Sequence, residues 1–437
     1  MQGGGASLTN YKSQQLPVLK AYEHNCIPAV FRHASKMKEA FQRWVSGFSD
    51  DVSLFLNEFG VQMYDEDTNL PMAQRVRNAL QRNLEKYEEY FFTAGGALNI
   101  KKCFYYFVGF LWTGTEWRYR ANAEMEVDPI QLTPTTLDHS GTPQQVQWCE
   151  ANEAQRTLGS CIAPDGNFYR QLEVLHDKLT AWKQCLRNLN SSNLQAKWLS
   201  YQTVFMKKIM YPLIGHCCGY GDLQEIQKPL DRELLHLLGL NEHFPRAVLH
   251  APLKYGGLGS VTIHGQHVIE KLILLVHHMR ENGQIRETML SSMGTTQLEC
   301  GSGQPFFTLP ADTWYQLVTS TWITHIWKEC QPTGIDIKFH PEIFWVPKPV
   351  RENDVCIMDV VSTMYEGEQL RRINMCRIKL QVTFISDIAA VDGTRILLGY
   401  YDGKRHQESG RRSRLNWPPV GELPQSWWQL WREFLIR

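Results

Sequence analysis

Residues 41–56 read FQRWVSGFSDDVSLFL, and this stretch decides how the N-terminal part of the chain folds. Apolar and aromatic residues at each end of the stretch enclose a short polar segment. An apolar run, a polar turn and a second apolar run predict a β-hairpin. Two adjacent carboxylates, Asp50 and Asp51, would then lie at the tip of that hairpin.

Paired carboxylates at a hairpin tip are suited to a hard divalent cation such as Mg²⁺, whose remaining positions accept phosphate oxygens. In phosphoryl transfer, two such ions about 3.5–4 Å apart clamp the attacking and leaving oxygens. The same two residues also occur in ordinary solvent-facing turns. The pair therefore indicates catalysis only if neighbouring motifs support it.

Three further motifs accompany the hairpin in a fixed order. QGGGAS at residues 2–7 precedes it, and GGALNIKKC at residues 95–103 and LGSCI at residues 158–162 follow. In this order and spacing the four motifs resemble the palm of a retroelement (non-LTR-like) reverse transcriptase. The resemblance covers most of the chain, roughly Gln2 to Arg437.

The resemblance implies roles for residues in the first two motifs. Gln2 and Gly4 belong to a segment similar to the Gln-Gly loop that packs under the templating base pair. Phe48, Asp50 and Asp51 match the aromatic-x-Asp-Asp hairpin, which implies that both carboxylates bind Mg²⁺.

The later motifs carry further implied roles. Lys102 would protonate the leaving pyrophosphate, and it should lie beside the hairpin in the same sheet. A surface lysine beside a strand is the alternative for this residue. Leu158 and Gly159 resemble the Leu-Gly turn that grips the primer end.

Two features depart from the family's pattern. Leu8 stands where most relatives have Pro, which affects the geometry of the first loop. The fingers and the first metal-binding Asp of such an enzyme come before the part of the pattern that residues 1–437 match. We therefore expect a fragment of an RNA-directed DNA polymerase of a retrotransposon that does not polymerise DNA alone.

The expected fold class is α+β, in three parts. Residues 1–165 would form a partial palm of antiparallel strands and helices, 166–290 a helical thumb-like region, and 291–437 a C-terminal extension of unassigned role. Apolar residues at helical spacing predict helices over 76–91 and 172–189 and a Trp-rich helix at the C-terminus. Aromatic and β-branched residues predict a buried strand over 98–112, a strand over 157–162 before an Asp165-Gly166 turn, and strands over 373–385.

Net charge is zero, with 45 basic and 45 acidic residues, so a site for a polyanion must be local. No acidic residue occurs between Asp177 and Asp222, whereas six cations do: Lys178, Lys183, Arg187, Lys197, Lys207 and Lys208. Aromatic residues lie among them: Trp182, Trp198, Tyr201, Phe205 and Tyr211. Cations neutralise phosphates and aromatic rings stack on bases, so this region predicts binding of an RNA/DNA template–primer.

A packed helical bundle with solvated lysines is the alternative for the same region. For Trp182 we expect a place in the core, because it lies on the apolar stripe of its helix. The rival function is a non-enzymatic nucleic-acid-binding or helical interaction protein, or a pseudogene product. Translating the genomic sequence upstream of Met1 would discriminate between these.

The 11 cysteines include no Cys-x-x-Cys pair, which favours a reduced intracellular compartment, cytoplasmic or nuclear. His216-Cys217-Cys218 is interpreted as ordinary buried thiols, since no second ligand pair has zinc-finger spacing. Gly256-Gly257-Leu258-Gly259 lacks the Lys-Ser/Thr of a phosphate-binding loop and predicts a turn. We expect no membrane span and no secretory leader, and the sequence leaves the oligomeric state open.

Overall fold

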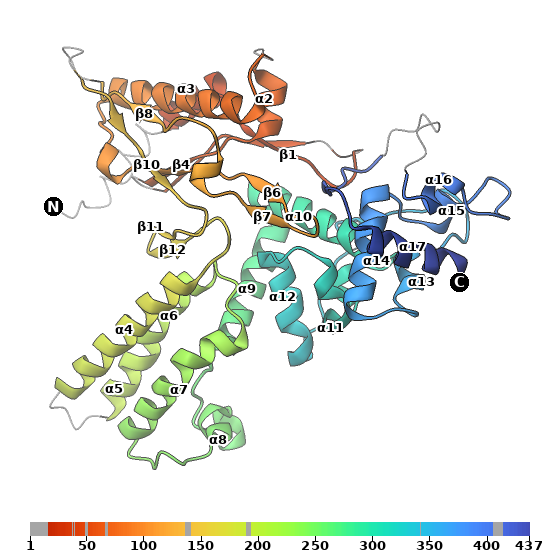
Figure 1. Ribbon diagram of the computed structural model, residues 1–437. Coiled ribbons are helices and arrows are strands. Elements are labelled where there is room, and N and C mark those ends of the chain that lie inside the picture. Colours follow the sequence, from red (N-terminus) through yellow and green to blue (C-terminus); the bar gives the residue numbers. More distant parts are fainter. Residues whose placement is uncertain are drawn as a thin grey trace. The chain divides into compact units, whose positions relative to one another are not determined.

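The computed structural model describes residues 16–36, 38, 40–48, 51–65, 69–135, 141–188, 194–340, 342–404 and 414–437. The chain is of mixed α+β class and divides into two compact units, each built from separate sequence segments (Figure 1). Unit 1 comprises Met1–Glu153, Glu287–Pro305 and Pro341–Arg437, and unit 2 comprises Ala154–Arg286 and Phe306–His340.

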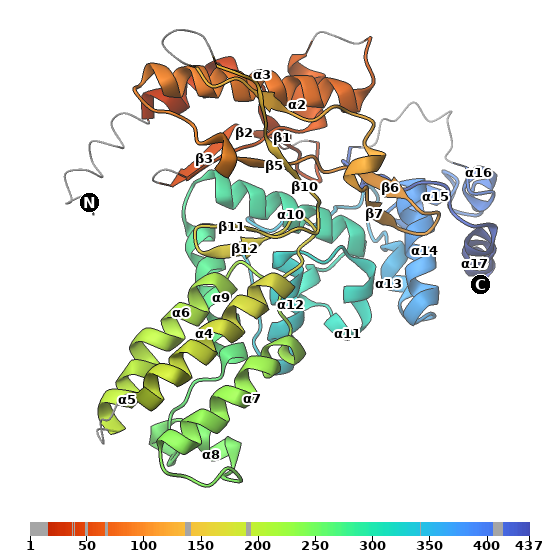
Figure 2. The same cartoon turned by 60° about the vertical axis from the view of Figure 1, so that its left-hand side comes forward.

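Short strands in two-stranded pairs make up the β structure of unit 1 (Figure 2). The antiparallel pairs are β1 (Ala29–Phe31) with β2 (Phe41–Arg43), β3 (Val45–Phe48) with β4 (Asp51–Leu54), β6 (Phe110–Trp112) with β7 (Trp117–Tyr119), and β8 (Gln131–Leu132) with β9 (Gln144–Gln145). β5 (Phe104–Tyr106) pairs in parallel with β10 (Gln147–Cys149).

The helices of unit 1 come from both ends of the chain. Residues 16–25 are helical, and α2 (Glu58–Tyr64), α3 (Met72–Thr93), η1 (Ile100–Lys102) and η2 (Asn122–Glu124) follow. Most of α10 (Gln284–Cys300) also belongs to this unit, with α13 (Ile357–Val361), α14 (Gly367–Leu380), α15 (Ile385–Ile388), α16 (Leu398–Tyr401) and α17 (Gln425–Ile436).

The predicted hairpin is confirmed between β3 and β4, whereas Phe41–Arg43, expected in its first strand, form β2 and pair with β1. Val45 pairs with Leu54 and Phe48 with Asp51. Val45, Val52 and Leu54 pack against a small core formed by buried Tyr22 and Tyr87, the latter on the predicted helix α3. Apolar residues on alternate positions of the strands are thereby covered by helices, as the pattern required.

The single buried strand predicted over residues 98–112 is wrong. The run divides into η1, β5 and β6, and two of the three β6 residues are exposed. The rings of β6 are covered by their β7 partners instead of by a core: Trp112 lies 5.3 Å from Trp117 and Phe110 4.9 Å from Tyr119. Cross-strand aromatic pairs of this kind stabilise an exposed ribbon.

The strands predicted over residues 373–385 are also wrong, because most of this segment is helix α14. Ile373, Cys376 and Leu380 are buried at helical spacing. Arg377 is fully buried and donates from Nη2 to the carbonyl oxygens of Leu298 at 2.7 Å and Glu299 at 3.0 Å. The segment is also rich in the helix formers Met, Arg, Lys and Leu, so both its composition and the spacing of its buried residues favour a helix.

Residues after 414 pack against the N-terminal part of unit 1. Asn416 donates from its backbone N to Ala34 O at 2.7 Å and from Nδ2 to His33 O at 2.7 Å. Trp112 Nε1 donates to Glu422 O at 2.8 Å. The predicted Trp-rich helix is confirmed as α17, and it packs against α14.

Unit 2 is mainly helical. Its elements are β11 (Gln155–Thr157), β12 (Ser160–Ile162), α4 (Tyr169–Asn188), α5 (Leu194–Ser200), the π-helical segment η3 (Tyr201–Phe205), α6 (Met206–Leu213), α7 (Tyr220–Leu237), α8 (Arg246–His250), η4 (Leu253–Tyr255), α9 (Ile263–Arg280), η5 (Phe306–Thr308), α11 (Ala311–Trp314), η6 (Tyr315–Leu317), α12 (Trp322–Cys330) and η7 (Gln331–Thr333).

The core of unit 2 joins α4, α6, α7 and α9. Leu175, Ile209, Leu230 and Ile263 are fully buried in one cluster, and Trp182 belongs to it, as predicted. The predicted helix over 172–189 corresponds to α4, and the predicted turn near residue 256 is confirmed by the left-handed Gly256.

The second hairpin turns at Leu158-Gly159, which the resemblance gave as a turn, and not at Asp165-Gly166 as the Asp-Gly pair predicted. Thr157 pairs with Ser160, so Leu158 and Gly159 form the turn, and Asp165-Gly166 lies beyond β12. A Leu-Gly dipeptide gives a weaker local indication of such a turn than Asp-Gly does, which explains the error.

Across the described ranges, no helix combines the length and the apolar character that crossing a membrane requires.

Candidate nucleic-acid interface

The structure describes the backbone of the hairpin that carries Asp50 and Asp51 only in part. Phe48 and Asp51 are the backbone partners that close β3 and β4. Asp50, Gln2 and Gly4 lie outside the described residues. Asp51 therefore begins β4, whereas the placement of Asp50 and of the Gln-Gly loop stays a prediction.

Lys102 ends the short helix η1 and is exposed. It does not share a sheet with the hairpin, contrary to expectation, because β3 and β4 pair only with each other among the described strands. The segment still lies beside the hairpin core, since Leu98 packs on the same cluster as Val45 and Val52. Residues 97–101 line a hollow of about 370 Å³ together with Pro134 and Gln144.

The turn between β11 and β12 is exposed and conformationally strained. Leu158 has φ 50° and Gly159 has φ 84°, so both turn residues are left-handed. Such a backbone is unfavourable for leucine, which is also 41% exposed here. Ser160 Oγ lies 2.8 Å from Nε2 of buried His216, and this contact ties the hairpin to the end of α6.

The cations of the acid-free region do not all have the same surroundings. Lys207 and Lys208 are exposed on α6, and Arg187 is exposed in the last turn of α4. Lys197 on α5 is half-buried. Lys183 lies 3.8 Å from Glu233 Oε2 on α7, so its charge is partly neutralised within the protein.

Three cations from three elements converge next to the exposed turn. Lys178 Nζ donates to Lys208 O at 3.2 Å, which links α4 to α6. Burial lowers the pKa of Lys178, and the positive charges of Arg156 on β11 and of Lys208 lower it further. We call Arg156, Lys178 and Lys208 the cationic cluster. Sequence reasoning missed Arg156, although it immediately precedes the Thr-Leu-Gly turn segment.

The structure also separates the aromatic residues of the region by burial. Trp182, Tyr201 and Phe205 are buried in the core, so they are not accessible to bases. Trp198 is half-buried and packs against the hydrophobic core of unit 2. Tyr211 is 63% exposed, and an ideal Cβ on Gly159 would lie 3.6 Å from its ring, which places Tyr211 beside the turn.

Buried basic and thiol groups gather behind this surface. Burial lowers the pKa of His216 to about 4, raises that of Cys218 to about 12 and lowers that of Lys271 to about 8. Lys271 Nζ lies 3.2 Å from His325 Nδ1, and His325 Nε2 lies 3.1 Å from Cys218 O. These contacts fix the α6–α7 connection against α9 and α12.

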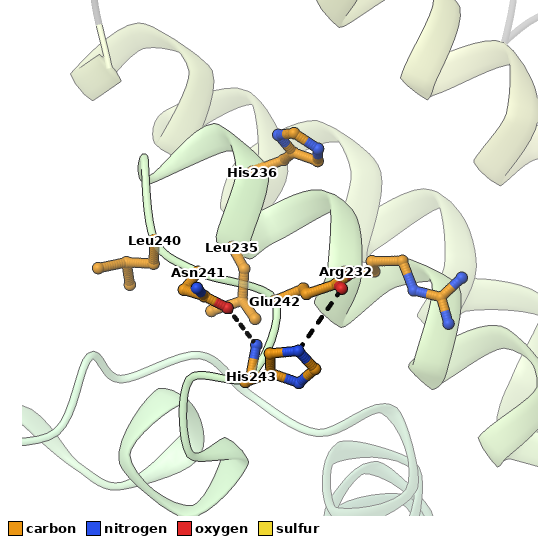
Figure 3. A pocket seen from close by; sticks show the side chains of 7 residues that line it. All are labelled: Arg232, Leu235, His236, Leu240, Asn241, Glu242 and His243. Atoms are coloured by element: carbon orange, nitrogen blue, oxygen red, sulfur yellow. Dashed lines mark hydrogen bonds and ion pairs between the residues drawn. The ribbon is translucent and has the colours of Figure 1, made fainter.

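A second hollow, of about 320 Å³, lies at the end of α7 (Figure 3). Its polar groups largely pair with one another: Asn241 Oδ1 accepts from the backbone N of His243 at 2.9 Å, and His243 Nε2 lies 3.7 Å from Glu242. Leu235 and Leu240 supply its apolar lining. Nothing in this arrangement indicates a reaction.

Comparison with known proteins adds no further information about this surface. No family model matches the chain, and no curated protein or solved structure matches it either.

Proposed function

We propose that the chain binds a template–primer duplex through the cationic cluster and Tyr211, as part of a retroelement RNA-directed DNA polymerase. The observation that carries the proposal is the convergence of Arg156, Lys178 and Lys208 from β11, α4 and α6. Burial and the positive charges of Arg156 and Lys208 lower the pKa of Lys178, and a polyanion placed beside these cations offsets their repulsion. A nucleic-acid backbone supplies such charge at regular intervals.

The neighbourhood of the cluster supports a nucleic acid over a small anion. Tyr211 is exposed beside the turn, and an exposed ring stacks on a sugar or a base. Leu158 is held in an unfavourable backbone conformation at an exposed position. Residues in strained backbone conformations cluster at ligand-binding and active sites, where the surrounding structure holds them in place.

In the same proposal, Asp50 and Asp51 would hold Mg²⁺ through hard carboxylate oxygens. Lys102 would serve as the general acid, because its exposed position in η1 leaves it accessible to a leaving group. We expect binding without nucleotide incorporation, because two carboxylates on one hairpin supply only one side of a two-metal clamp.

The binding proposal is tested by salt titration with a labelled RNA–DNA hybrid. The affinity of the wild-type chain should fall steeply as the salt concentration rises. A plot of the logarithm of the association constant against the logarithm of the salt concentration should have a slope of about −0.9 per phosphate neutralised. Reversal of two cluster charges, Arg156→Glu with Lys208→Glu, should abolish binding at physiological salt.

The matched control is Lys228→Glu with Lys254→Glu, which reverses two exposed charges on α7 and η4 of the same unit. This variant should retain the wild-type slope. Equal losses in both double variants would mean that net charge alone, and not the cluster, determines binding.

Polymerisation is tested separately by primer extension with Mg²⁺ on an RNA template. Incorporation that disappears in Asp51→Asn would show that the chain is a complete catalyst. Binding without incorporation would favour the alternative of a nucleic-acid-binding protein without enzymatic activity.

A further inference from the structure

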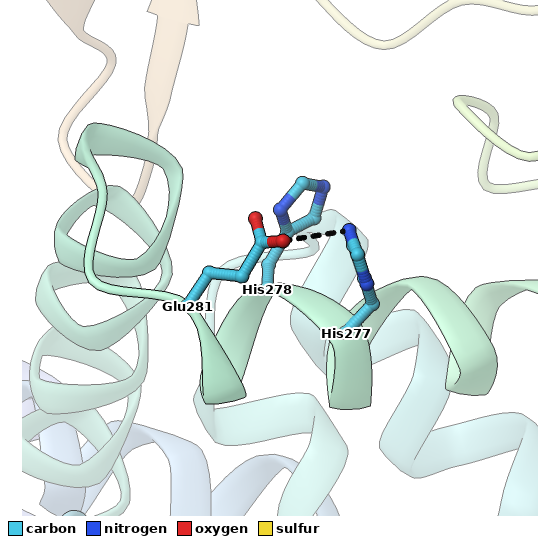
Figure 4. A group of neighbouring side chains, drawn as sticks. All are labelled: His277, His278 and Glu281. Atoms are coloured by element: carbon cyan, nitrogen blue, oxygen red, sulfur yellow. Dashed lines mark ion pairs between the residues drawn. The ribbon is translucent and has the colours of Figure 1, made fainter.

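The last turn of α9 carries three side chains with metal-ligating atoms. His277, His278 and the C-cap residue Glu281 each offer one such atom, and these atoms all lie within 4.8 Å of one another. His277 and Glu281 point toward each other, and the ring of His278 stands next to both (Figure 4). Within the described part of the chain, no other group of three such residues meets this condition.

The distances suit a transition metal. His277 Nε2 lies 3.3 Å from Glu281 Oε1, and the imidazole rings have centroids 5.3 Å apart. Bonds of about 2.0–2.1 Å to nitrogen and oxygen at tetrahedral angles separate neighbouring ligands by about 3.3–3.4 Å. An ion placed between His277 and Glu281 therefore needs little rearrangement of those two side chains.

The position on the helix also favours a cation. The carbonyl groups of the last helical turn give this end of α9 a partial negative charge. Arg280 is the neighbouring positive charge, and its repulsion is screened because it is exposed to solvent. His277 and Glu281 are 59% and 60% exposed, so an ion can reach them without opening the fold.

We propose that His277, His278 and Glu281 form a binding site for a transition-metal dication of the Zn²⁺ or Ni²⁺ class. Two imidazoles and one carboxylate select such ions over Mg²⁺, which prefers oxygen ligands throughout. Three protein ligands leave at least one position for water. The ion would fix Glu281 to the end of α9 at the start of the 281–283 connection to α10.

The site is tested with Ni²⁺ as the probe, by equilibrium dialysis at constant pH in excess Mg²⁺. The cysteines and the remaining histidines of the chain can also bind Ni²⁺. The amount of bound Ni²⁺ is therefore compared between wild type and the variants. Wild-type chain should bind one more Ni²⁺ than His277→Ala, His278→Ala or Glu281→Gln. Mutation of a residue that only orients a metal ligand costs about 10–100-fold in metal affinity. Loss of one of the three direct ligands should cost at least as much.

The matched control is His243→Ala, which removes an exposed histidine that lies 3.7 Å from Glu242. It should bind as much Ni²⁺ as wild type. A second readout is residue-specific: Ni²⁺ should protect His277 and His278, but not His243, from carbethoxylation by diethyl pyrocarbonate. Equal Ni²⁺ binding by all variants, or full binding by His278→Ala, would reduce the group to an ordinary His–Glu ion pair and overturn the proposal.

Discussion

Lys178 Nζ donates a hydrogen bond to the main-chain carbonyl oxygen of Lys208 across 3.2 Å, and so fixes a cation of α4 over the backbone of α6. The contact holds the Lys178 ammonium near the Lys208 backbone instead of letting it extend freely into solvent. A preorganised cation loses less side-chain entropy when it binds a phosphate than a freely rotating lysine does.

Lys178→Met should therefore weaken binding of an RNA–DNA hybrid. We expect the log–log salt slope to become less steep by about 0.9, the value for one lost phosphate contact. Fluorescence anisotropy at several salt concentrations measures the slope. Lys183→Met is the control, because Lys183 already lies 3.8 Å from Glu233, and it should change the slope little. Equal effects of the two substitutions would contradict the assignment of the cationic cluster.

Leu158→Asn should stabilise the protein while weakening nucleic-acid binding. Asparagine tolerates the left-handed backbone that Leu158 adopts at φ 50°, so we expect the free energy of unfolding to rise by about 1 kcal/mol. The loss of an exposed apolar contact beside Tyr211 should reduce affinity. Denaturant unfolding and anisotropy measure the two effects. The control is Leu253→Asn at another exposed leucine in the same unit; an equal gain in stability there would argue against relief of backbone strain.

Lys271→Met should change how stability depends on pH. The folded-state pKa of Lys271 is about 8, against 10.5 when unfolded, because burial disfavours its charged form. Between these values the unfolded chain holds a proton that the folded chain has lost, so stability rises with pH. The free energy of unfolding of wild type, minus that of the variant, should rise by on the order of 3 kcal/mol from pH 8 to pH 10.5.

Denaturant unfolding at pH 8 and at pH 10.5 measures this difference. Burial raises the pKa of Cys217 and of Cys218, and the charge of Lys271 lowers both, so the difference between wild type and variant reports Lys271 together with its coupling to these two thiols. A difference that stays constant with pH would mean that Lys271 keeps an ordinary pKa in the folded chain.

Gly421→Ala should loosen the docking of the C-terminal segment in unit 1. A Cβ at this position would lie 2.2 Å from Trp112 Cδ1, while Trp112 Nε1 is held at 2.8 Å by Glu422 O. The ring cannot move away without losing that bond, so we expect a cost of about 1–3 kcal/mol in unfolding free energy. Gly283→Ala, where a Cβ meets open space, should be neutral. Thermal unfolding compares the two variants, and equal behaviour would disprove the steric argument.

The local spacing of apolar residues was sufficient to predict those helices and strands that bury one apolar face. The apolar spacing of residues 76–91 and 172–189 predicted α3 and most of α4, because a helix with one apolar stripe buries it wherever a partner lies. The sequence of an apolar run, a polar segment and a second apolar run over residues 41–56 predicted the β3–β4 hairpin. For the candidate interface, the six cations and the lack of acidic residues between Asp177 and Asp222 were also evident from the sequence.

Tertiary structure alone decided which of these residues are accessible and what they contact. Residues 373–380 are helical, and buried Arg377 of this helix bonds to backbone carbonyls of α10, about eighty positions earlier in the chain. Lys183 and Lys178 are five residues apart on α4, but one faces Glu233 and the other Lys208. Arg156 joins the cationic cluster from a different element. Such contacts depend on distances between segments remote in sequence, which periodicity along one segment does not encode.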